Sequence, residues 1–261
     1  MRLHLVAADI GNTTISIGLF RGSKLVGTVK IPTRAHSRYR GALIRFMKKC
    51  RADAKEADAV IVSSVVPDAL GRFVKVAAGV FGRRVLVVGK DIQAALRNAY
   101  RRPRQVGQDR LVNAVAVKEI YGCPAIVIDF GTAVTFDCVS RGGAYLGGLI
   151  LPGIELSFWG LYERTALLPK VKIAPVSSII GRDTVESMRA GVLFGFGALC
   201  DGLVDRLRGK LGARSRVVAT GGNSMLVKRY SGSIRIVDEH LTLKGLRIIF
   251  ASREGRRGDF L

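Results

Sequence analysis

The sequence has 261 residues, 48% of them hydrophobic and none in a low-complexity tract, so it can form one large domain or two of about 100–150 residues. No stretch offers the roughly 18 uncharged apolar residues of a membrane helix, and Asp9 interrupts the apolar N-terminal run too early for a signal peptide. The chain is strongly basic, with 42 Lys and Arg against 20 Asp and Glu and a formal net charge of +22. Such a charge favours anionic partners.

The basic residues are scattered along the chain, with local density at Arg97–Arg110 and at Arg253–Arg257. No aromatic-interleaved basic stripe, zinc finger or reading helix accompanies them. We therefore interpret the charge as a general surface property that attracts acidic small molecules, and we predict no specific nucleic-acid site.

The four cysteines stand far apart without a Cys-x-x-Cys pair, and the three histidines show no ligand spacing. This usage is typical of free thiols in a reducing cytoplasm and gives little support to a metal hydrolase. We expect a cytoplasmic protein.

The first half of the sequence predicts strands alternating with helices. Residues 1–32 read as three short strands, of which the third covers Leu25–Ile31. An irregular, Arg-rich loop containing Pro103 precedes the last helix of this half. The remaining elements expected here are helices over Arg40–Cys50, Pro67–Ala78 and Asp109–Tyr121, and strands over Ala59–Ser64 and Arg84–Val88.

The second half repeats this layout, which favours an α/β fold with mixed sheets. A border near residues 115–124 gives an N-terminal domain over 1–116 and a C-terminal domain over 117–261. The elements expected here are strands over Ala125–Asp129, Val134–Val139, Tyr145–Ile150 and Arg216–Thr220, helices over Glu155–Thr165 and Thr184–Leu211, and a glycine turn at Gly221–Ser224.

One short pattern occurs twice, 120 residues apart. Each copy has an apolar strand ending in Asp, a tight turn with Gly and hydroxyl residues, and a second strand. The copies begin at Asp9 and Asp129. Glycine lets a backbone approach an anion, turn N–H groups and hydroxyls donate to phosphate oxygens, and the Asp can hold a cation. The pair suggests a duplicated fold that closes on a nucleotide between its halves.

This duplication resembles the actin and hexokinase superfamily of ATP-binding folds, and the chain resembles the type III pantothenate kinases over nearly its whole length. The resemblance rests on an ordered set of landmarks rather than on any single one. Gln108 is a small departure, because the family commonly has Ala there. The landmarks are Asp9–Thr13, Tyr100-x-x-Pro103, Gly107–Arg110, Asp129–Thr135, Gly147–Gly153, Gly181-x-x-Thr184, Thr220–Asn223 and Leu241–Leu246.

The resemblance implies a duplicated actin-like (ribonuclease H-like) two-domain fold with mixed sheets flanked by helices. It also implies ATP-dependent phosphorylation of pantothenate to 4′-phosphopantothenate, the first step toward coenzyme A. Expected cofactors are ATP with Mg²⁺ and a monovalent cation, K⁺ or NH₄⁺. A homodimer is implied as well. The expectation of no membrane association rests on the hydropathy of the sequence, not on the resemblance.

The roles of individual residues are likewise implied by the resemblance. A primary alcohol needs a positioned carboxylate to take its proton, and Asp109 is the expected general base. Asp129 is the expected ligand of the monovalent cation. The expected ATP-binding residues are Asp9, Ile10, Gly11, Asn12, Thr13, Thr14 and Thr132, and the expected substrate-binding residues are Tyr100, Gly107, Gln108, Asp109, Arg110 and Thr184.

Two other classes of function remain open at this point. One is a different small-molecule kinase, such as a sugar kinase, although the Gly107–Arg110 and Gly181–Thr184 landmarks argue against it. The other is a non-catalytic or regulatory family member that binds nucleic acid, suggested by the net charge of +22. Retention of Asp9, Asp109, Asp129 and Thr132 weighs against lost catalysis.

Overall fold

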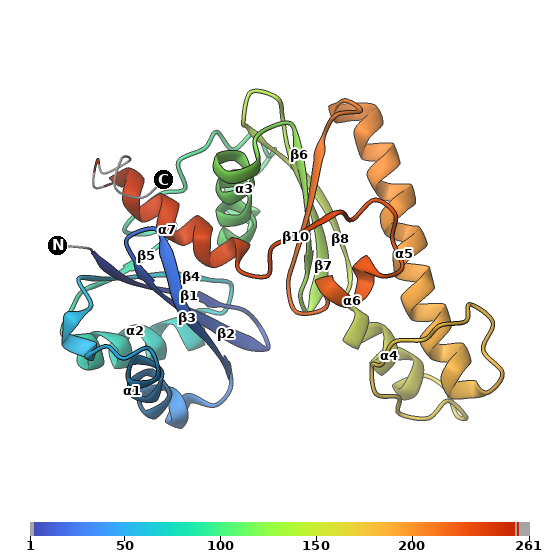
Figure 1. Ribbon diagram of the computed structural model, residues 1–261, viewed down its shortest axis with the longest axis horizontal. Coiled ribbons are helices and arrows are strands. Elements are labelled where there is room, and N and C mark those ends of the chain that lie inside the picture. The colour runs from blue at the N-terminus through green and yellow to red at the C-terminus, as the bar shows by residue number, and fades with distance from the viewer. Residues whose placement is uncertain (1–2, 254, 256–261) are drawn as a thin grey trace. The chain divides into compact units, whose positions relative to one another are not determined.

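The computed structural model describes residues 3–253 and residue 255, and the chain forms two compact units (Figure 1). The first consists of Met1–Glu119 with Leu241–Leu261, and the second of Ile120–His240. The first crossing between units lies close to the predicted border after residue 116. The predicted C-terminal domain runs on to residue 261, whereas the chain beyond His240 rejoins the first unit. The basic run at Arg253–Arg257 lies partly outside the described residues.

The two units contain five-stranded sheets of the same topology. Their strand orders are β3-β2-β1-β4-β5 and β10-β9-β6-β7-β8. In each sheet the first three strands form an antiparallel meander, and the last two run parallel to the first. The predicted duplication and mixed sheets are therefore confirmed.

Most predicted elements are present with ends shifted by a few residues, while α6, β10 and α7 were not predicted. The strands are β1 (His4–Ile10), β2 (Thr14–Arg21), β3 (Lys24–Pro32), β4 (Ala59–Ser64), β5 (Val85–Val87), β6 (Ala125–Phe130), β7 (Ala133–Val139), β8 (Tyr145–Pro152), β9 (Arg216–Thr220) and β10 (Ile236–Val237). The helices are α1 (Tyr39–Lys49), α2 (Pro67–Phe81), α3 (Gln108–Tyr121), α4 (Ile154–Glu163), α5 (Thr184–Leu211), α6 (Ser224–Lys228) and α7 (Leu241–Arg253), with short 3₁₀ turns η1 (His36–Arg38), η2 (Ala54–Glu56) and η3 (Pro103–Gln105).

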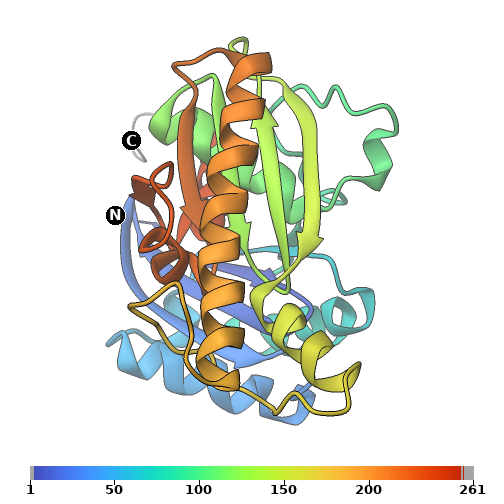
Figure 2. The same ribbon diagram turned by 90° about the vertical axis from the view of Figure 1, so that its right-hand side faces the viewer.

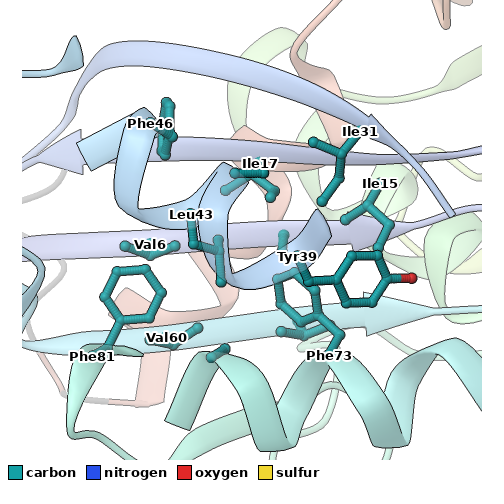
Figure 3. Close-up of a cluster of buried hydrophobic side chains, with 14 of the residues drawn as sticks. Val6, Ile15, Ile17, Ile31, Tyr39, Leu43, Phe46, Val60, Phe73 and Phe81 are labelled. Atoms are coloured by element: carbon teal, nitrogen blue, oxygen red, sulfur yellow. The ribbon is translucent and has the colours of Figure 1, made fainter. Parts of the chain in front are cut away.

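Each face of the first sheet is covered by helices. On one face, β-strand side chains such as Ile15 and Val60 pack against Leu43 of α1 and Phe73 of α2 (Figure 3). On the other face, Leu5 and Ala7 of β1 pack with apolar residues of α3 and α7. The alternation of buried side chains between two faces is what a strand with period two requires. It explains why α7 joins this unit, because α7 fills the second face.

The second sheet packs one face against α4, α5 and α6. Figure 2 shows α5 running along this face of the sheet. By length and hydropathy alone α5 could span a membrane. It carries Arg189 and Asp201, however, and its side chains Met188, Phe196 and Cys200 belong to the core of the unit. We therefore interpret α5 as a core helix.

Asp201 fastens the loop after α6 to α5. Its carboxylate accepts hydrogen bonds from Ser231 Oγ (2.6 Å), from Gly232 N (3.1 Å) and from Ser233 N (2.9 Å). Burial acts to raise the pKa of Asp201, but these donors outweigh it and the pKa of Asp201 is lowered overall. The charged carboxylate therefore stabilises the folded state.

We predict that Asp201→Asn lowers the free energy of unfolding by about 1–2 kcal/mol at pH 7, because charge-assisted hydrogen bonds are lost. Since the folded pKa is depressed, the stabilisation is complete above the unfolded pKa of about 3.9 and is lost as pH falls through the folded pKa. Urea unfolding of both proteins between pH 7 and pH 3 measures the difference. The matched control is Asp205→Asn, an exposed carboxylate on the same helix, expected to change stability by less than about 0.5 kcal/mol. A difference that does not depend on pH would contradict this account.

Candidate active site

The two repeated Asp residues occupy equivalent positions in the two sheets. Asp9, near the end of β1, lies opposite Ser16 of β2 and Ser63 of β4. Asp129 of β6 lies in the same way opposite Thr135 of β7 and Thr220 of β9. Register partners project from the same face of a sheet. Each carboxylate is therefore flanked by a hydroxyl side chain on both neighbouring strands.

The first turn is closed by its own backbone and braced by Thr33. Gly11 N donates to Thr14 O (3.0 Å). Thr33 Oγ1 donates to Gly11 O (2.7 Å), and Thr33 N donates to Thr13 O (2.9 Å). Thr33 O in turn accepts a hydrogen bond from the hydroxyl of Tyr39, which is buried in the core of the unit. The turn is thus fixed from the side of the protein interior.

The side chains at the tip of this turn face solvent, because Asn12, Thr13 and Thr14 are exposed. Ile10 differs from them, since its side chain is completely buried and belongs to the hydrophobic core. Any contact of Ile10 with a ligand must therefore come from its backbone. Asp9 is half-buried, and its Oδ1 accepts a hydrogen bond from Ser63 Oγ (2.5 Å).

The second turn lies in the other unit and is packed by a glycine. Gly131 N donates to Ala133 O (3.1 Å), and Gly153 N donates to Thr132 O (3.1 Å). A Cβ atom at Gly153 would lie 2.3 Å from Thr132 O and 2.6 Å from Gly131 O. Only glycine permits this approach of two backbones. Thr132 itself is exposed.

Asp129 lies in a cradle formed by the turn after β9. Gly221 has φ +88°, and a Cβ atom there would lie 2.6 Å from Asp129 Oδ1 and 2.6 Å from Phe130 O. The Asp129 carboxylate and the Phe130 carbonyl therefore approach the Gly221 backbone more closely than any side chain at that position would allow. Hard cations take oxygen ligands of this kind, so the donor set fits a cation.

Asp109 is in the first turn of α3, in the same unit as the Asp9 turn. Its Oδ1 accepts a hydrogen bond from Arg110 N (2.8 Å). A Cβ atom at Gly107 would lie 2.5 Å from Asp109 Oδ1 and 3.3 Å from Val65 Cγ1. Val65 N donates to Ile10 O (3.2 Å). Because Gly107 has no side chain, the Asp109 carboxylate can pack against the Gly107 backbone. Gly107 also lies close to Val65, in the segment that follows β4.

Burial raises the pKa of Asp109 above its usual value. The N–H and the charge of Arg110 oppose this effect but do not cancel it. A carboxylate with a raised pKa is a stronger base than an ordinary Asp once it is ionised, and such perturbed groups are typical of active sites.

Gln108 packs against a second glycine. Gly89 has φ +87°, and a Cβ atom there would lie 2.7–3.0 Å from the carboxamide atoms of Gln108. Oε1 of Gln108 is buried and accepts no hydrogen bond from the described residues. The side chain of Gln108 therefore contributes to the packing between α3 and the turn after β5.

The other expected substrate-binding residues lie in different surroundings. Arg110 is 8% exposed, which excludes a simple surface position. Tyr100 is half-buried, and its N–H donates to Asn98 Oδ1 (3.0 Å). Tyr100, Gln108, Asp109 and Arg110 belong to the first unit, whereas Thr184 belongs to the second.

Thr184 is the exposed first residue of α5. The helix start is capped by Asp183, whose Oδ1 accepts from Glu186 N (2.8 Å), while Glu186 Oε2 accepts from Arg182 N (3.0 Å). This reciprocal arrangement is a variant of the capping box. A Cβ atom at Gly181 would lie 2.3 Å from Ser187 N, so the glycine lets the preceding chain pack on the helix start.

Sequence reasoning missed Ser63 and Thr33, which bind the first Asp and the first turn. Ser63 follows a run of buried β4 residues, and its hydroxyl at the strand end was a usable signal. No local signal marks Thr33.

Among residues 3–253 and 255, no three His, Cys, Asp or Glu side chains lie together as a metal cluster.

Comparison with known proteins identifies a family that this chain matches. The model of the family described as "Type III pantothenate kinase" matches residues 5–206. The type III pantothenate kinase of Geobacter sulfurreducens is 41% identical over 249 residues, covering 94% of this chain and 98% of that protein. The enzyme of the same name from Myxococcus xanthus is 42% identical over 249 residues, covering 94% and 97%.

Solved structures with low sequence identity share the fold. A putative Baf family transcriptional activator from Campylobacter jejuni has a TM-score of 0.60 at 18% identity, with 96% of this chain and 99% of that chain covered. MreB 5 of Spiroplasma citri has a TM-score of 0.55 at 10% identity, with 97% of each chain covered. A ROK hexokinase from Thermus thermophilus has a TM-score of 0.50 at 14% identity, with 95% and 98% covered. The predicted actin-like and hexokinase-like fold is confirmed.

Proposed function

This chain belongs to the type III pantothenate kinase family, and we propose that it transfers the γ-phosphoryl group of ATP to the primary alcohol of pantothenate. The products are 4′-phosphopantothenate, ADP and a proton, in the first step toward coenzyme A. One structural observation supports this most strongly. Asp109, a half-buried carboxylate whose pKa is raised, belongs to the same unit as the exposed turn after Asp9.

Asp109 acts as the general base in this proposal. The alcohol proton passes to an Asp109 oxygen as the bond from the alcohol oxygen to phosphorus forms and the bond to the ADP oxygen breaks. The half-buried setting of Asp109 favours proton uptake. Its hydrogen bond from Arg110 N fixes the carboxylate in one orientation.

Pantothenate carries a carboxylate, and Arg110 is the cation that we assign to it. A guanidinium is suited to bind carboxylate with two parallel hydrogen bonds. Tyr100, Gly107, Gln108 and Thr184 complete the proposed substrate contacts. Support for Gly107 comes from its contact with the general base, because the Asp109 carboxylate packs so closely on Gly107 that a Cβ atom there would lie 2.5 Å from Asp109 Oδ1.

The phosphates of ATP bind to the exposed turn tips. We assign Gly11, Asn12, Thr13 and Thr14, the backbone of Ile10, and the Thr132 hydroxyl to them. Phosphoryl transfer depends mainly on such positioning and on charge neutralisation. Mg²⁺ keeps several waters, so the single carboxylate of Asp9 beside the Ser63 hydroxyl suits it. Bound Mg²⁺ supplies charge stabilisation on the phosphate oxygens.

Asp129 holds the monovalent cation, K⁺ or NH₄⁺. The fit rests on donor chemistry, because the Asp129 carboxylate and the Phe130 carbonyl are oxygen donors that both lie next to the Gly221 turn. The cation supplies positive charge that offsets the negative charge of substrate and phosphate.

The four free cysteines are consistent with a reducing compartment, and we place the activity in the cytoplasm.

We propose a homodimer formed through the second unit. β8 is an edge strand of its sheet, and its side chains Leu146 and Ile150 are 45% and 66% exposed. The neighbouring helix α4 exposes Leu156, Trp159 and Tyr162 at spacings of three residues. The exposed apolar side chains on these two consecutive elements are the observation that supports an interface with a second copy.

We predict that Asp109→Asn lowers kcat by about 10²–10⁴-fold while ATP binding, measured by calorimetry, is retained. In the wild type, the acid limb of kcat/KM should lie above the ordinary Asp pKa of about 3.9, because the base is active only when deprotonated and its pKa is raised. The control is Asp68→Asn in the first turn of α2, expected to keep its turnover. A variant at Asp109 that keeps most of its turnover would assign the base elsewhere.

We predict faster turnover in KCl or NH₄Cl than in NaCl at matched ionic strength, because we assign K⁺ or NH₄⁺ to Asp129. Asp129→Asn should lower turnover and remove the difference between salts. Initial rates in the three salts measure this. Equal wild-type rates in all three, or an unchanged salt response in the variant, would refute the assignment of the cation to Asp129.

We predict that Trp159→Glu shifts the protein from a dimer to a monomer of 28.2 kDa in sedimentation velocity. The new charge would be buried in the proposed interface. Met225→Glu is the matched control, because Met225 is 53% exposed on α6, outside the proposed interface. This variant should remain a dimer. A wild type that sediments as a monomer at micromolar concentration would rule out this interface.

A further inference from the structure

The loop that precedes the Gly107–Arg110 motif contains four exposed arginines, Arg97, Arg101, Arg102 and Arg104. We call residues 97–104 the arginine loop. No acidic residue occurs between Asp91 and Asp109. In the part of the chain that the structure describes, the side chains of these arginines make no hydrogen bond or ion pair. Their positive charge is therefore not neutralised locally.

The backbone of the arginine loop is held in place by its own contacts. Asn98 Oδ1 accepts from Tyr100 N (3.0 Å), and Asn98 Nδ2 donates to Pro103 O (3.3 Å). The 3₁₀ turn η3 follows, with Gln105 N donating to Arg102 O (2.9 Å). Figure 2 shows the connection between β5 and α3 as an extended loop with a short helical turn. The like charges are thus held near one another rather than spread by motion of an unfolded segment.

The arginine loop leads directly into the proposed site. Arg104 and Asp109 are five residues apart in the sequence, so their Cα atoms are no more than about 18 Å apart. The Debye length is roughly 14 Å at 0.05 M salt, so at this salt concentration the arginine charges are only partly screened at Asp109, and the screening increases as salt is added. Like charges in proximity repel one another, and an anion that approaches them relieves this repulsion.

We propose that the arginine loop attracts the anionic substrates MgATP and pantothenate to the site electrostatically, without a fixed contact. This inference rests on the proposed function. A nucleic-acid partner is less well supported, because Tyr100 is the one aromatic residue in the loop and is half-buried rather than available for base stacking. The arginine loop belongs to the same unit as Asp109 and the Asp9 turn. We therefore assign its positive charge a role at the proposed kinase site.

The test compares kcat/KM of the wild type with that of the triple variant Arg101→Gln, Arg102→Gln, Arg104→Gln. At about 0.05 M salt we expect a loss of about twofold for pantothenate, which carries one negative charge. The loss for MgATP should be about fourfold, because its doubled charge doubles the interaction energy. At about 0.5 M salt the two proteins should converge, since screening removes the effect. The turnover number kcat should stay within twofold throughout.

The matched control is the triple variant Arg45→Gln, Lys48→Gln, Lys49→Gln on α1. It removes the same charge from exposed positions, and α1 covers the opposite face of the first sheet from α3. Its kcat/KM should stay close to that of the wild type at every salt concentration. Equal losses of kcat/KM in the two triple variants would show that only the net charge of the protein matters, and this result would overturn the proposal.

Further outcomes separate this proposal from its alternatives. A wild type without pantothenate kinase activity would refute the proposed function itself, whereas an active wild type with unchanged kinetics in the loop variant would refute only the role of the loop. A short DNA duplex is added as a probe in both proteins. Binding to the wild type at 0.15 M salt that the loop variant loses, together with unchanged kinetics, would assign the loop to nucleic acid and overturn the proposal.

Discussion

The hydrogen bonds that Thr33 makes to the turn after β1 are the constraint on which the geometry of this turn, in the first unit, depends. A turn that binds phosphate must present its tip to solvent, yet it must not move when an anion arrives. Thr33 meets both needs, because it binds Gly11 O and Thr13 O from the interior side. Its own carbonyl is held by Tyr39, whose ring is packed edge-on against Phe73 in the core. The turn is thus held rigid by its connection, through Thr33 and Tyr39, to the hydrophobic core.

The second unit reaches the same result by a different route. Its turn is held by a hydrogen bond from the backbone of Gly153, and the Asp129 carboxylate packs against the backbone of Gly221. Both approaches are too close for any side chain. The strand order and the hydroxyl neighbours of Asp9 and Asp129 are nevertheless equivalent. Duplication has therefore preserved the carboxylate and its sheet position, while the support behind each turn has diverged.

The sequence predicted the repeated strands and their turns because period-two apolar runs and glycine turns are local signals, and β4, β9 and α5 agree with their predicted bounds. It did not predict α6 and β10, which are five and two residues long, nor the return of α7 to the first unit. That return depends on burying α7 against β1, a contact between the two ends of the chain. The residues that brace the turns, Thr33 and Gly153, are also set by distant contacts. The chemical roles of Asp109 and Asp129 remain predictions.

Product analysis of the wild-type enzyme tests the central claim most directly, since the claim concerns which bond is formed. The purified protein is incubated with ATP, Mg²⁺, K⁺ and pantothenate, and the products are identified by mass spectrometry and phosphorus NMR. The account predicts one 4′-phosphopantothenate for each ADP, with the phosphate on the primary alcohol. Release of ADP without phosphorylated pantothenate, or no turnover in the presence of both cations, would contradict it.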